Sequence, residues 1–321
     1  MKRSCGIVAF GIIALLALAG PAQAGNLANS LTITGTDFAA FGDSGLRGVG
    51  AGEIVVSGIT GTVNEAYVLW HGPTRASDPD VNVVITFGGT DVTGVNIGQS
   101  SDNCWGFSNS QAYRADVSTL VTGDGTYAYS FPGFAAGSVE MNGASLLIFY
   151  DDGDSGNNLD VAVFDGNDSN ISNPFDDPGW NATLSGINYS SGTAEMLMVV
   201  SDGQTFDDLG VAINATVLFG PGLNFQGDTL PNQGGCPSGC LWDHRTEDVT
   251  SFLTPGPNTL TLTDSGSGSD CLSLIAAVFI LPAGAIEPVE VAIPTMGRVG
   301  VVVMTVLLLA AGAFVLRRFS V

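Results

Sequence analysis

An acidic loop holds the side chains of this chain that are best suited to chemistry. Residues 151–160 read DDGDSGNNLD and lie between two apolar runs. Oxygen ligands at alternate positions can wrap a hard cation such as Ca²⁺, and glycines permit the tight turns of such a loop. The loop predicts a calcium site with these ligands: Asp152, Asp154, Asn158 and Asp160. The alternative is a solvated hairpin loop in which Asp, Asn and Gly supply turn conformations and nothing binds.

Recognisable catalytic motifs do not occur in the sequence. Its two histidines, His71 and His244, belong to no nucleophile or metal-binding pattern, and there is neither a G-x-S-x-G elbow nor an H-E-x-x-H motif. Carboxylates are so numerous that finding two of them together does not indicate a glycosidase-type pair. We therefore expect a protein that is not an enzyme.

Short β-strands must position these loops. Runs rich in β-branched and aromatic residues recur between Gly, Asp, Asn and Pro, which predicts an all-β protein of the sandwich type. The expected strands cover residues 66–70, 81–87, 126–131, 144–150, 159–164, 195–200, 214–219, 259–263 and 272–281. Residues 145–150 and 274–281 are continuously apolar, which indicates strands that are covered on both faces.

An internal repeat suggests how the strands are grouped. Cys104 and Trp105 are followed by an arginine, an Asp-Val-Ser turn, a glycine turn and an apolar strand; Cys240 and Trp242 are followed by the same order with Asp-Val-Thr. The repeat predicts two tandem β-sandwich modules of jelly-roll type, residues 25–170 and 171–285. The alternative is chance self-similarity in a chain of biased composition.

The N-terminus has the three parts of a secretory signal peptide. Lys2 and Arg3 precede an apolar stretch at residues 7–19, and an A-x-A cleavage site ends at Ala24. We expect residues 1–24 to be removed on export.

The C-terminus combines a short motif, an apolar segment and a basic tail. Residues 299–316 hold no charge and, at about 1.5 Å per residue, can cross a hydrocarbon core of about 30 Å as one transmembrane helix. Residues 317–321 then form a basic cytoplasmic tail. The preceding linker, residues 286–298, leads into the helix and carries most of a motif formed by Ile293, Pro294, Thr295, Met296 and Gly300.

Residues 293–321 resemble the IPTL-CTERM sorting domains of Gram-negative bacteria, in which an I-P-T-L-x-x-W-G motif precedes one transmembrane helix and an Arg-rich end. Met296 stands where Leu is usual, and Val299 where Trp is usual. The resemblance implies an exosortase-type sorting enzyme as a partner, a transient stay in the inner membrane, and delivery to the cell surface or the medium. The alternative is a plain single-pass anchor.

Charge excludes nucleic acid as a partner. Residues 25–293 hold all 31 acidic residues against four arginines and no lysine, a formal charge of −27. A field of that sign repels nucleic acid and anionic lipid and favours solubility, divalent cations or basic partners.

Four cysteines remain after removal of the signal peptide: Cys104, Cys236, Cys240 and Cys271. An even number in an exported chain indicates two disulfides, of which three pairings are possible. A zinc site is the alternative, but only one close pair of cysteines exists. Trp105 and Trp242, beside cysteines in both repeats, are expected to pack in the core on a disulfide.

Several strings in the exported part resemble uncharacterised bacterial and archaeal surface domains: YVLW at 67–70, YRADV at 113–117 and ASLLIFY at 144–150. This resemblance implies a surface location and no particular chemistry. We therefore expect a non-catalytic cell-surface protein with a structural or adhesive role, whose partners are surface glycans or other exoproteins. The alternative is a calcium-stabilised carbohydrate-binding module, in which Trp180 stacks on the sugar from a turn-rich stretch.

Overall fold

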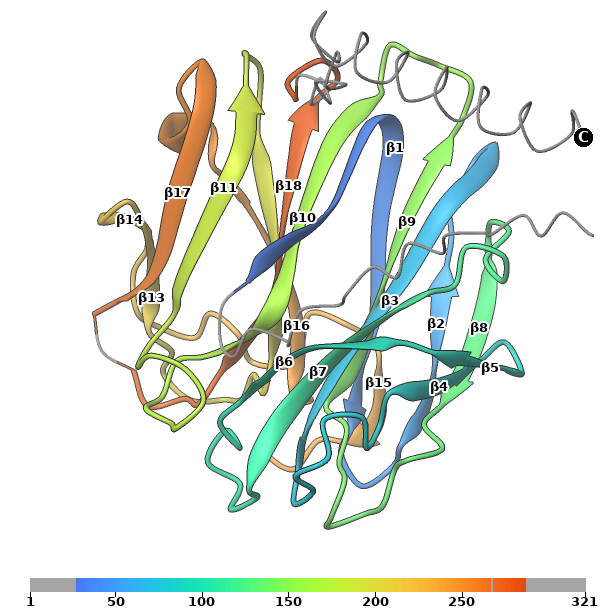
Figure 1. Cartoon of the computed structure of the whole chain (residues 1–321), viewed down its shortest axis with the longest axis vertical. Helices are drawn as coiled ribbons and strands as arrows, with labels where there is room; N and C mark the ends of the chain where they lie inside the picture. Colours follow the sequence, from blue (N-terminus) through green and yellow to red (C-terminus); the bar gives the residue numbers. More distant parts are fainter. Residues whose placement is uncertain (1–26, 267, 287–321) are drawn as a thin grey trace, which may run out of the picture. The chain divides into compact units, whose positions relative to one another are not determined.

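The computed structural model describes residues 27–266 and 268–286, which form one compact unit with strands and a single 3₁₀ turn at Thr250–Phe252 (Figure 1). Its all-β character confirms the predicted fold class. Within the described residues, no helix is both long and apolar enough to cross a membrane. The predicted signal peptide, sorting motif, transmembrane helix and basic tail lie outside these residues.

The first nine strands are β1 (Ala28–Leu46), β2 (Ala51–Val56), β3 (Thr62–Thr74), β4 (Val84–Phe87), β5 (Thr90–Thr93), β6 (Val95–Ser100), β7 (Asn109–Asp116), β8 (Gly125–Ser130) and β9 (Gly143–Asp151). The next nine are β10 (Leu159–Ser169), β11 (Asn181–Tyr189), β12 (Glu195–Ser201), β13 (Gly210–Ile213), β14 (Thr216–Phe219), β15 (Asn232–Gly235), β16 (Trp242–Asp248), β17 (Gly256–Ser265) and β18 (Ser273–Pro282).

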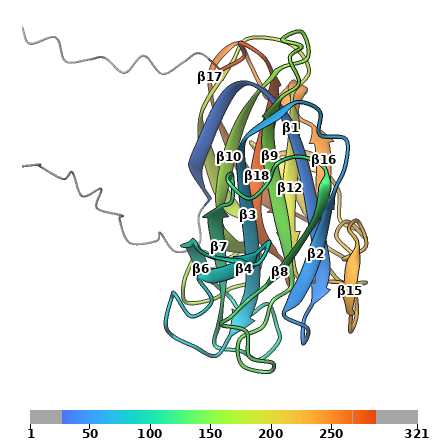
Figure 2. The same ribbon diagram turned by 90° about the vertical axis from the view of Figure 1, so that its right-hand side faces the viewer.

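One large sheet runs through the molecule, and β1 joins its two halves. Its order is β16-β12-β18-β10-β1-β9-β3-β7-β6, and β15 also pairs with β1. The first part of β1 pairs with β10 and the second part with β9. Two four-stranded sheets, β2-β8-β4-β5 and β11-β17-β13-β14, complete the fold (Figure 1, Figure 2).

Three apolar clusters show that these sheets are layered. One cluster joins β3, β7 and β9 to the sheet β2-β8-β4-β5, and a second joins β10, β12 and β18 to the sheet β11-β17-β13-β14. The third joins β3 and β9 to β10, β12 and β18, so the two halves of the large sheet bend at β1 and pack face to face.

This layering explains the continuously apolar strands. Leu146 and Ile148 of β9 belong to the outer cluster, whereas Leu147 and Phe149 belong to the cluster between the two halves. Successive residues of a strand point to opposite faces, so a strand with both faces covered needs apolar residues at every position. Strand β1 was not predicted, because its 19 residues have no comparable apolar run and are placed by the strands on both sides.

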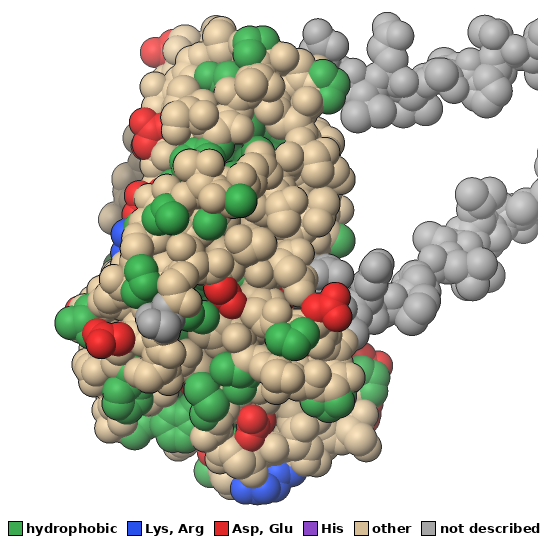
Figure 3. All heavy atoms as spheres, turned by 90° about the vertical axis from the view of Figure 1, so that its left-hand side faces the viewer, with side chains coloured by type: hydrophobic (Ala, Val, Ile, Leu, Met, Phe, Trp, Pro, Cys, Tyr) green, Lys and Arg blue, Asp and Glu red, His purple; other side chains and the backbone are tan. Residues whose placement is uncertain are grey.

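The strand order repeats: strands in the first half of the chain correspond to strands whose numbers are nine higher in the second half. The series β1-β9-β3-β7 corresponds to β10-β18-β12-β16, and β2-β8-β4-β5 corresponds to β11-β17-β13-β14. Strand β10 lies before residue 170, in the first predicted module, but pairs with β18 of the second. The face that carries β11 and β17 shows scattered acidic side chains on a mostly uncharged surface (Figure 3).

Candidate functional site

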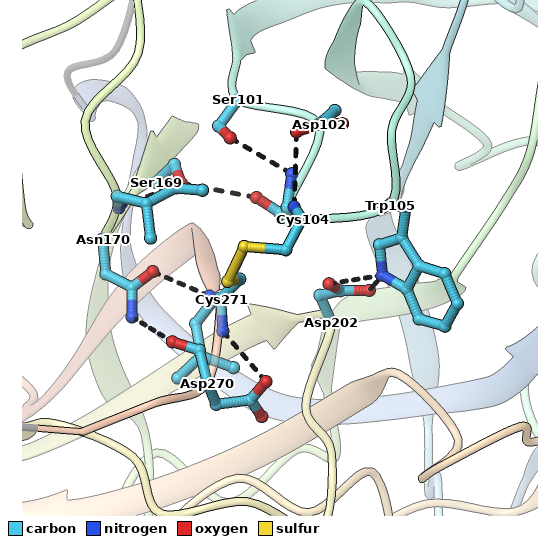
Figure 4. Close-up of a disulfide and its surroundings, with 12 residues drawn as sticks. Ser101, Asp102, Cys104, Trp105, Ser169, Asn170, Asp202, Asp270 and Cys271 are labelled. Atoms are coloured by element: carbon cyan, nitrogen blue, oxygen red, sulfur yellow. Dashed lines mark hydrogen bonds between the residues drawn. A yellow bond between two sulfur atoms is a disulfide. The ribbon is translucent and has the colours of Figure 1, made fainter.

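The candidate site lies at one end of the large sheet, where loops far apart in the sequence meet. They follow β1 and β12 and precede β7, β9 and β16. Both predicted disulfides form here: Cys104–Cys271 links the loop before β7 to the residues before β18 (Figure 4), and Cys236–Cys240 closes the loop before β16. The loops at this end are therefore held by covalent bonds as well as by the sheet.

Backbone conformation also marks this end of the molecule. Six non-glycine residues in the described part of the chain have positive φ, and four of these belong to the loops of the site: Asn103, Cys104, Asp202 and Leu241. Such conformations cost about 1–3 kcal/mol each and concentrate at binding and catalytic sites. The clustering supports a functional role for these loops.

A cavity of about 560 Å³ opens between these loops. Trp105, Phe107 and Pro237 line it with apolar surface, and Arg47 and Glu140 supply charge. Backbone of Gly48, Gly234 and Gly235 forms much of the remaining wall. We call this cavity the Trp105 cleft.

Arg47 is fixed in the wall of the Trp105 cleft. Its guanidinium lies 4.1 Å from the ring centroid of Trp105, in a cation–π contact. Its Nε and Nη2 atoms donate to Oδ1 of Asn142 at 3.1 and 2.5 Å, and Nη2 also lies 3.2 Å from Oδ1 of Asp202. The Nη1 atom is buried and has no hydrogen-bond partner in the protein.

Asp202 lies beneath the cleft and orients its walls. Both carboxylate oxygens accept a hydrogen bond from Nε1 of Trp105 at 2.8 Å, and Oδ1 also accepts from Asn142 at 3.1 Å (Figure 4). Asp202 is completely buried. Burial raises the pKa of its carboxyl group to about 8, although the donors Arg47, Trp105 and Asn142 act in the opposite direction.

Glu140 is the carboxylate of the cleft wall. Its Oε2 accepts from the backbone N–H of Gly48 at 2.8 Å, and Oε1 accepts from that of Gly137. Each oxygen of a carboxylate can accept a second hydrogen bond, so both bonds leave acceptor capacity for a ligand or a water. Glu140 also raises the pKa of Arg47 against the lowering effect of burial.

Trp105 separates the cleft from a second cavity of about 290 Å³. Gln204, Phe206 and Asp270 line this cavity together with the Cys104–Cys271 disulfide. Phe206 is 46% exposed, which is unusual for a phenylalanine. The indole of Trp105 thus presents surface to two neighbouring hollows.

Two serine–histidine pairs lie below the site and are sealed from it. Nδ1 of His71 is 2.7 Å from Oγ of Ser201, and Nε2 of His244 is 2.6 Å from Oγ of Ser145. Burial lowers the pKa of His71 to about 3 and that of His244 to about 4, so both rings are neutral near pH 7. His71 and both serines are fully buried, whereas His244 is partly exposed, so no substrate can reach the hydroxyl group of either pair.

The predicted calcium ligands are not brought together as a set. Asp160 is buried and accepts from the backbone N–H groups of Gly35 and Ile286. Asp154 accepts from Gly156 within the loop, and Nδ2 of Asn158 donates to the carbonyl of Gly35. Asp152 instead approaches Asp37 and Asp151, so that one oxygen of each lies within 4.8 Å of the others. The loop remains a predicted site, and Asp37 was not among its predicted ligands.

The predictions made from the sequence for two tryptophans, Trp180 and Trp105, were wrong. Trp180 is only 3% exposed and packs against Phe225, so it offers no stacking face for a sugar. Trp242 is fully buried, as expected, but its repeat counterpart Trp105 is half-buried and lines the cleft. The one feature of the sequence that could have pointed to this cleft was Arg47, which is among only four basic residues between residues 25 and 293.

No protein-family model and no curated protein matches the chain. Among solved structures it is similar to PNGase F, a glycosylasparaginase from Flavobacterium meningosepticum, with 13% identity over 79% of this chain and 96% of that chain and a TM-score of 0.30. A recombinant N-glycanase F matches with 11% identity, 77% and 96% coverage and a TM-score of 0.29. A peptide-N(4)-(N-acetyl-beta-D-glucosaminyl) asparagine amidase matches with 11% identity, 78% and 97% coverage and a TM-score of 0.23.

These matches correct the expectation of a non-catalytic, structural or adhesive protein, because the similar solved structures are those of enzymes. The expectation that the chain is not an enzyme is corrected for the same reason. At these identities and TM-scores the likeness transfers no reaction, substrate or catalytic residue to this chain. Its chemistry has to be argued from the Trp105 cleft.

Proposed function

We propose that the chain is an exported hydrolase that cleaves an amide or ester bond of a neutral substrate held in the Trp105 cleft. The observation that carries this proposal is the convergence of a stacking surface, a carboxylate and a guanidinium group on one cavity, through Trp105, Glu140 and Arg47. Aromatic faces bind flat apolar faces of a ligand, and the polar groups fix its orientation.

Charge favours a neutral substrate. Asp202 and Glu140 already offset the charge of Arg47, and the exported part is strongly acidic. An anionic ligand would therefore meet repulsion without a free cation to bind it. Neutral amide and hydroxyl groups, such as those of glycoconjugates or exoproteins at the cell surface, match the donors and acceptors of the wall.

The charge distribution favours acyl over glycosidic cleavage. Hydrolysis of a glycoside passes through a cationic, oxocarbenium-like state and uses two carboxylates that flank the bond. Of the carboxylates that we assign to the Trp105 cleft, Glu140 lies in the wall, whereas Asp202 is sealed beneath Trp105. Acyl transfer develops negative charge on the carbonyl oxygen, which the fixed positive charge of Arg47 in the cleft wall can stabilise.

Glu140 and Arg47 then have different roles in the reaction. Glu140 accepts a proton from a water as that water adds to the carbonyl carbon, and the positive charge of Arg47 stabilises the carbonyl oxygen as that oxygen gains negative charge. When the carbon–nitrogen or carbon–oxygen bond breaks, the proton passes from Glu140 to the leaving amine or alcohol. Asp202 is a positioning residue, since it holds Arg47 and Trp105 without facing the substrate.

The test is a search for turnover with a panel of neutral amides and esters, including glycopeptides and acetylated sugars, with mass spectrometry to detect addition of one water. Glu140→Gln keeps the side-chain shape and should lower the rate by about 10²–10⁴-fold. Glu195→Gln is the matched control, because Glu195 is exposed at the start of β12 and touches no part of the cleft. Equal rates for Glu140→Gln and wild type would refute the assignment of Glu140.

Export and sorting are part of the same proposal. The signal peptide, the IPTL-CTERM-like tail and an exosortase-type partner are supported by the sequence, and two disulfides are typical of an oxidising compartment. Intact mass spectrometry of the protein from the cell surface tests the tail. A mass that ends near Ile293 or Thr295 indicates processing, whereas one that extends to Val321 indicates a plain anchor.

We also propose that the fold consists of two tandem jelly-roll-like β-sandwich modules. The offset of nine in strand order supports this division and favours a boundary in the residues between β9 and β10, earlier than the predicted one near residue 170. Each module contributes walls to the Trp105 cleft: Arg47 and Glu140 come from the first, and Cys236 and Pro237 from the second.

A further inference from the structure

A pair of carboxylates at the ends of β10 and β17 is held by two consecutive backbone amides. The N–H of Trp180 donates to Oδ2 of Asp264 at 2.9 Å, and the N–H of Asn181 donates to Oδ2 of Asp168 at 3.1 Å. The two carboxylates are therefore neighbours at the start of β11, and the charge of Asp264 acts on Asp168. This place is distinct from the Trp105 cleft and from the 151–160 loop.

The second oxygen of each carboxylate has no partner. Oδ1 of Asp168 and Oδ1 of Asp264 are both buried and accept no hydrogen bond from the protein. Asp168 as a whole is fully buried. Buried polar atoms are nearly always paired, so two such oxygens in one place indicate a missing positive partner.

Neighbouring charges make the need for such a partner stronger. The pKa of Asp168 is raised to about 8 by burial, which is the largest effect, and by repulsion from the carboxylates of Asp176, Asp264 and Asp177. Burial also raises the pKa of Asp264 to about 6. Asp176 is already engaged by Ser100 and Asn173, whereas Asp177 is exposed on the adjoining loop.

We infer that Asp168 and Asp264 bind a divalent hard cation, best matched by Ca²⁺, through their free Oδ1 atoms. Calcium takes six to eight oxygen ligands in flexible geometry, so water can complete the shell. The cation would join β10, β11 and β17 and stabilise this corner of the fold. A proton shared between the two carboxylates is the competing explanation, and it makes a different prediction.

Terbium luminescence tests the site directly on the full-length chain. Tb³⁺ replaces Ca²⁺ at oxygen sites and is sensitised by a nearby tryptophan, and Trp180 lies next to the amide that binds Asp168. After treatment with EDTA, Tb³⁺ should give saturable emission that Ca²⁺ displaces. Trp180→Phe should lower the emission, and Asp168→Asn and Asp264→Asn should abolish it.

The matched control is Asp152→Asn in the 151–160 loop, which should leave the emission unchanged. Loss of emission in Asp152→Asn, or full emission in Asp264→Asn, would overturn the assignment. Asp264 is only partly buried, so its asparagine variant tests the site even if Asp168→Asn does not fold.

Thermal unfolding separates the cation from the shared proton. With a cation site, Ca²⁺ raises the Tm of the wild type, and Asp264→Asn raises the Tm of the metal-free protein but removes the response to Ca²⁺. With a shared proton, Tm rises on acidification and Ca²⁺ has no effect, which would overturn the proposal.

Discussion

Removal of each disulfide should have very different consequences for stability. Cys104 and Cys271 are 167 residues apart in the sequence, whereas Cys236 and Cys240 are four apart. A disulfide restricts the unfolded chain, and the entropy that it removes grows with the logarithm of the closed loop. The double variants Cys104→Ser/Cys271→Ser and Cys236→Ser/Cys240→Ser therefore form an internal comparison.

The loop-closure relation gives the magnitudes. For the separation of 167 it gives about 5 kcal/mol of stabilisation at 25 °C, and for the separation of four about 2 kcal/mol. Cys104 is exposed and Cys271 is partly exposed, so serine at these positions should add little packing cost. We expect the long-range pair to matter more by about 3 kcal/mol.

Urea unfolding followed by tryptophan fluorescence measures both variants against the wild type at the same pH. The expected result is a lower midpoint for Cys104→Ser/Cys271→Ser, with a slope of free energy against urea that rises because the unfolded chain is more expanded. Equal losses in the two variants, or a larger loss for Cys236→Ser/Cys240→Ser, would refute the loop-closure reasoning. Reduced wild-type protein should reproduce the sum of the two losses.

Three further predictions concern buried charge and close backbone contacts. Stability should fall between pH 7 and 8 in EDTA, because carboxyl groups whose pKa is higher in the folded than in the unfolded state lose their stabilising effect as the pH rises through the folded-state pKa. The two histidines are neutral in the folded state and have an unfolded pKa of about 6.5, so they oppose this fall only weakly in that range. Urea midpoints that stay constant would contradict this. The groups with pKa values raised to about 7 or 8 are Asp168, Asp202 and Asp208. Above pH 8, where Asp202 is ionised, Asp202→Asn should cost about 3–5 kcal/mol and release Trp105, because it removes the carboxylate that pairs with the buried Arg47; thermal unfolding and tryptophan emission at this pH measure both effects, and an unchanged Tm would show that the ion pair is dispensable. Gly72→Ala should prevent folding, because its Cβ would lie 1.9 Å from the carbonyl oxygen of Glu140, whereas Gly220→Ala meets nothing within 4 Å and should be neutral; circular dichroism of the two variants checks the contrast.

Much of the fold could be predicted from the sequence, because its signals are local. Alternating or continuous apolar runs report which faces of a strand are covered, and they located strands such as β9 and β18. The number of cysteines in an exported chain predicted two disulfides, which the structure contains. Strand β1 escaped prediction because the strands beside it, and not its own pattern, determine its place.

The site depended on the tertiary structure. Arg47 and Asp202 are 155 residues apart, and only the bend of the large sheet at β1 brings them together. Trp105 and Trp242 occupy equivalent places in the repeat, yet one lines a cleft and the other is buried between the halves of the sheet. Composition and periodicity determined that the chain folds as an acidic β-protein. Long-range strand pairing decided which of its many carboxylates are buried together, because register and layer packing are set by partners distant in the sequence.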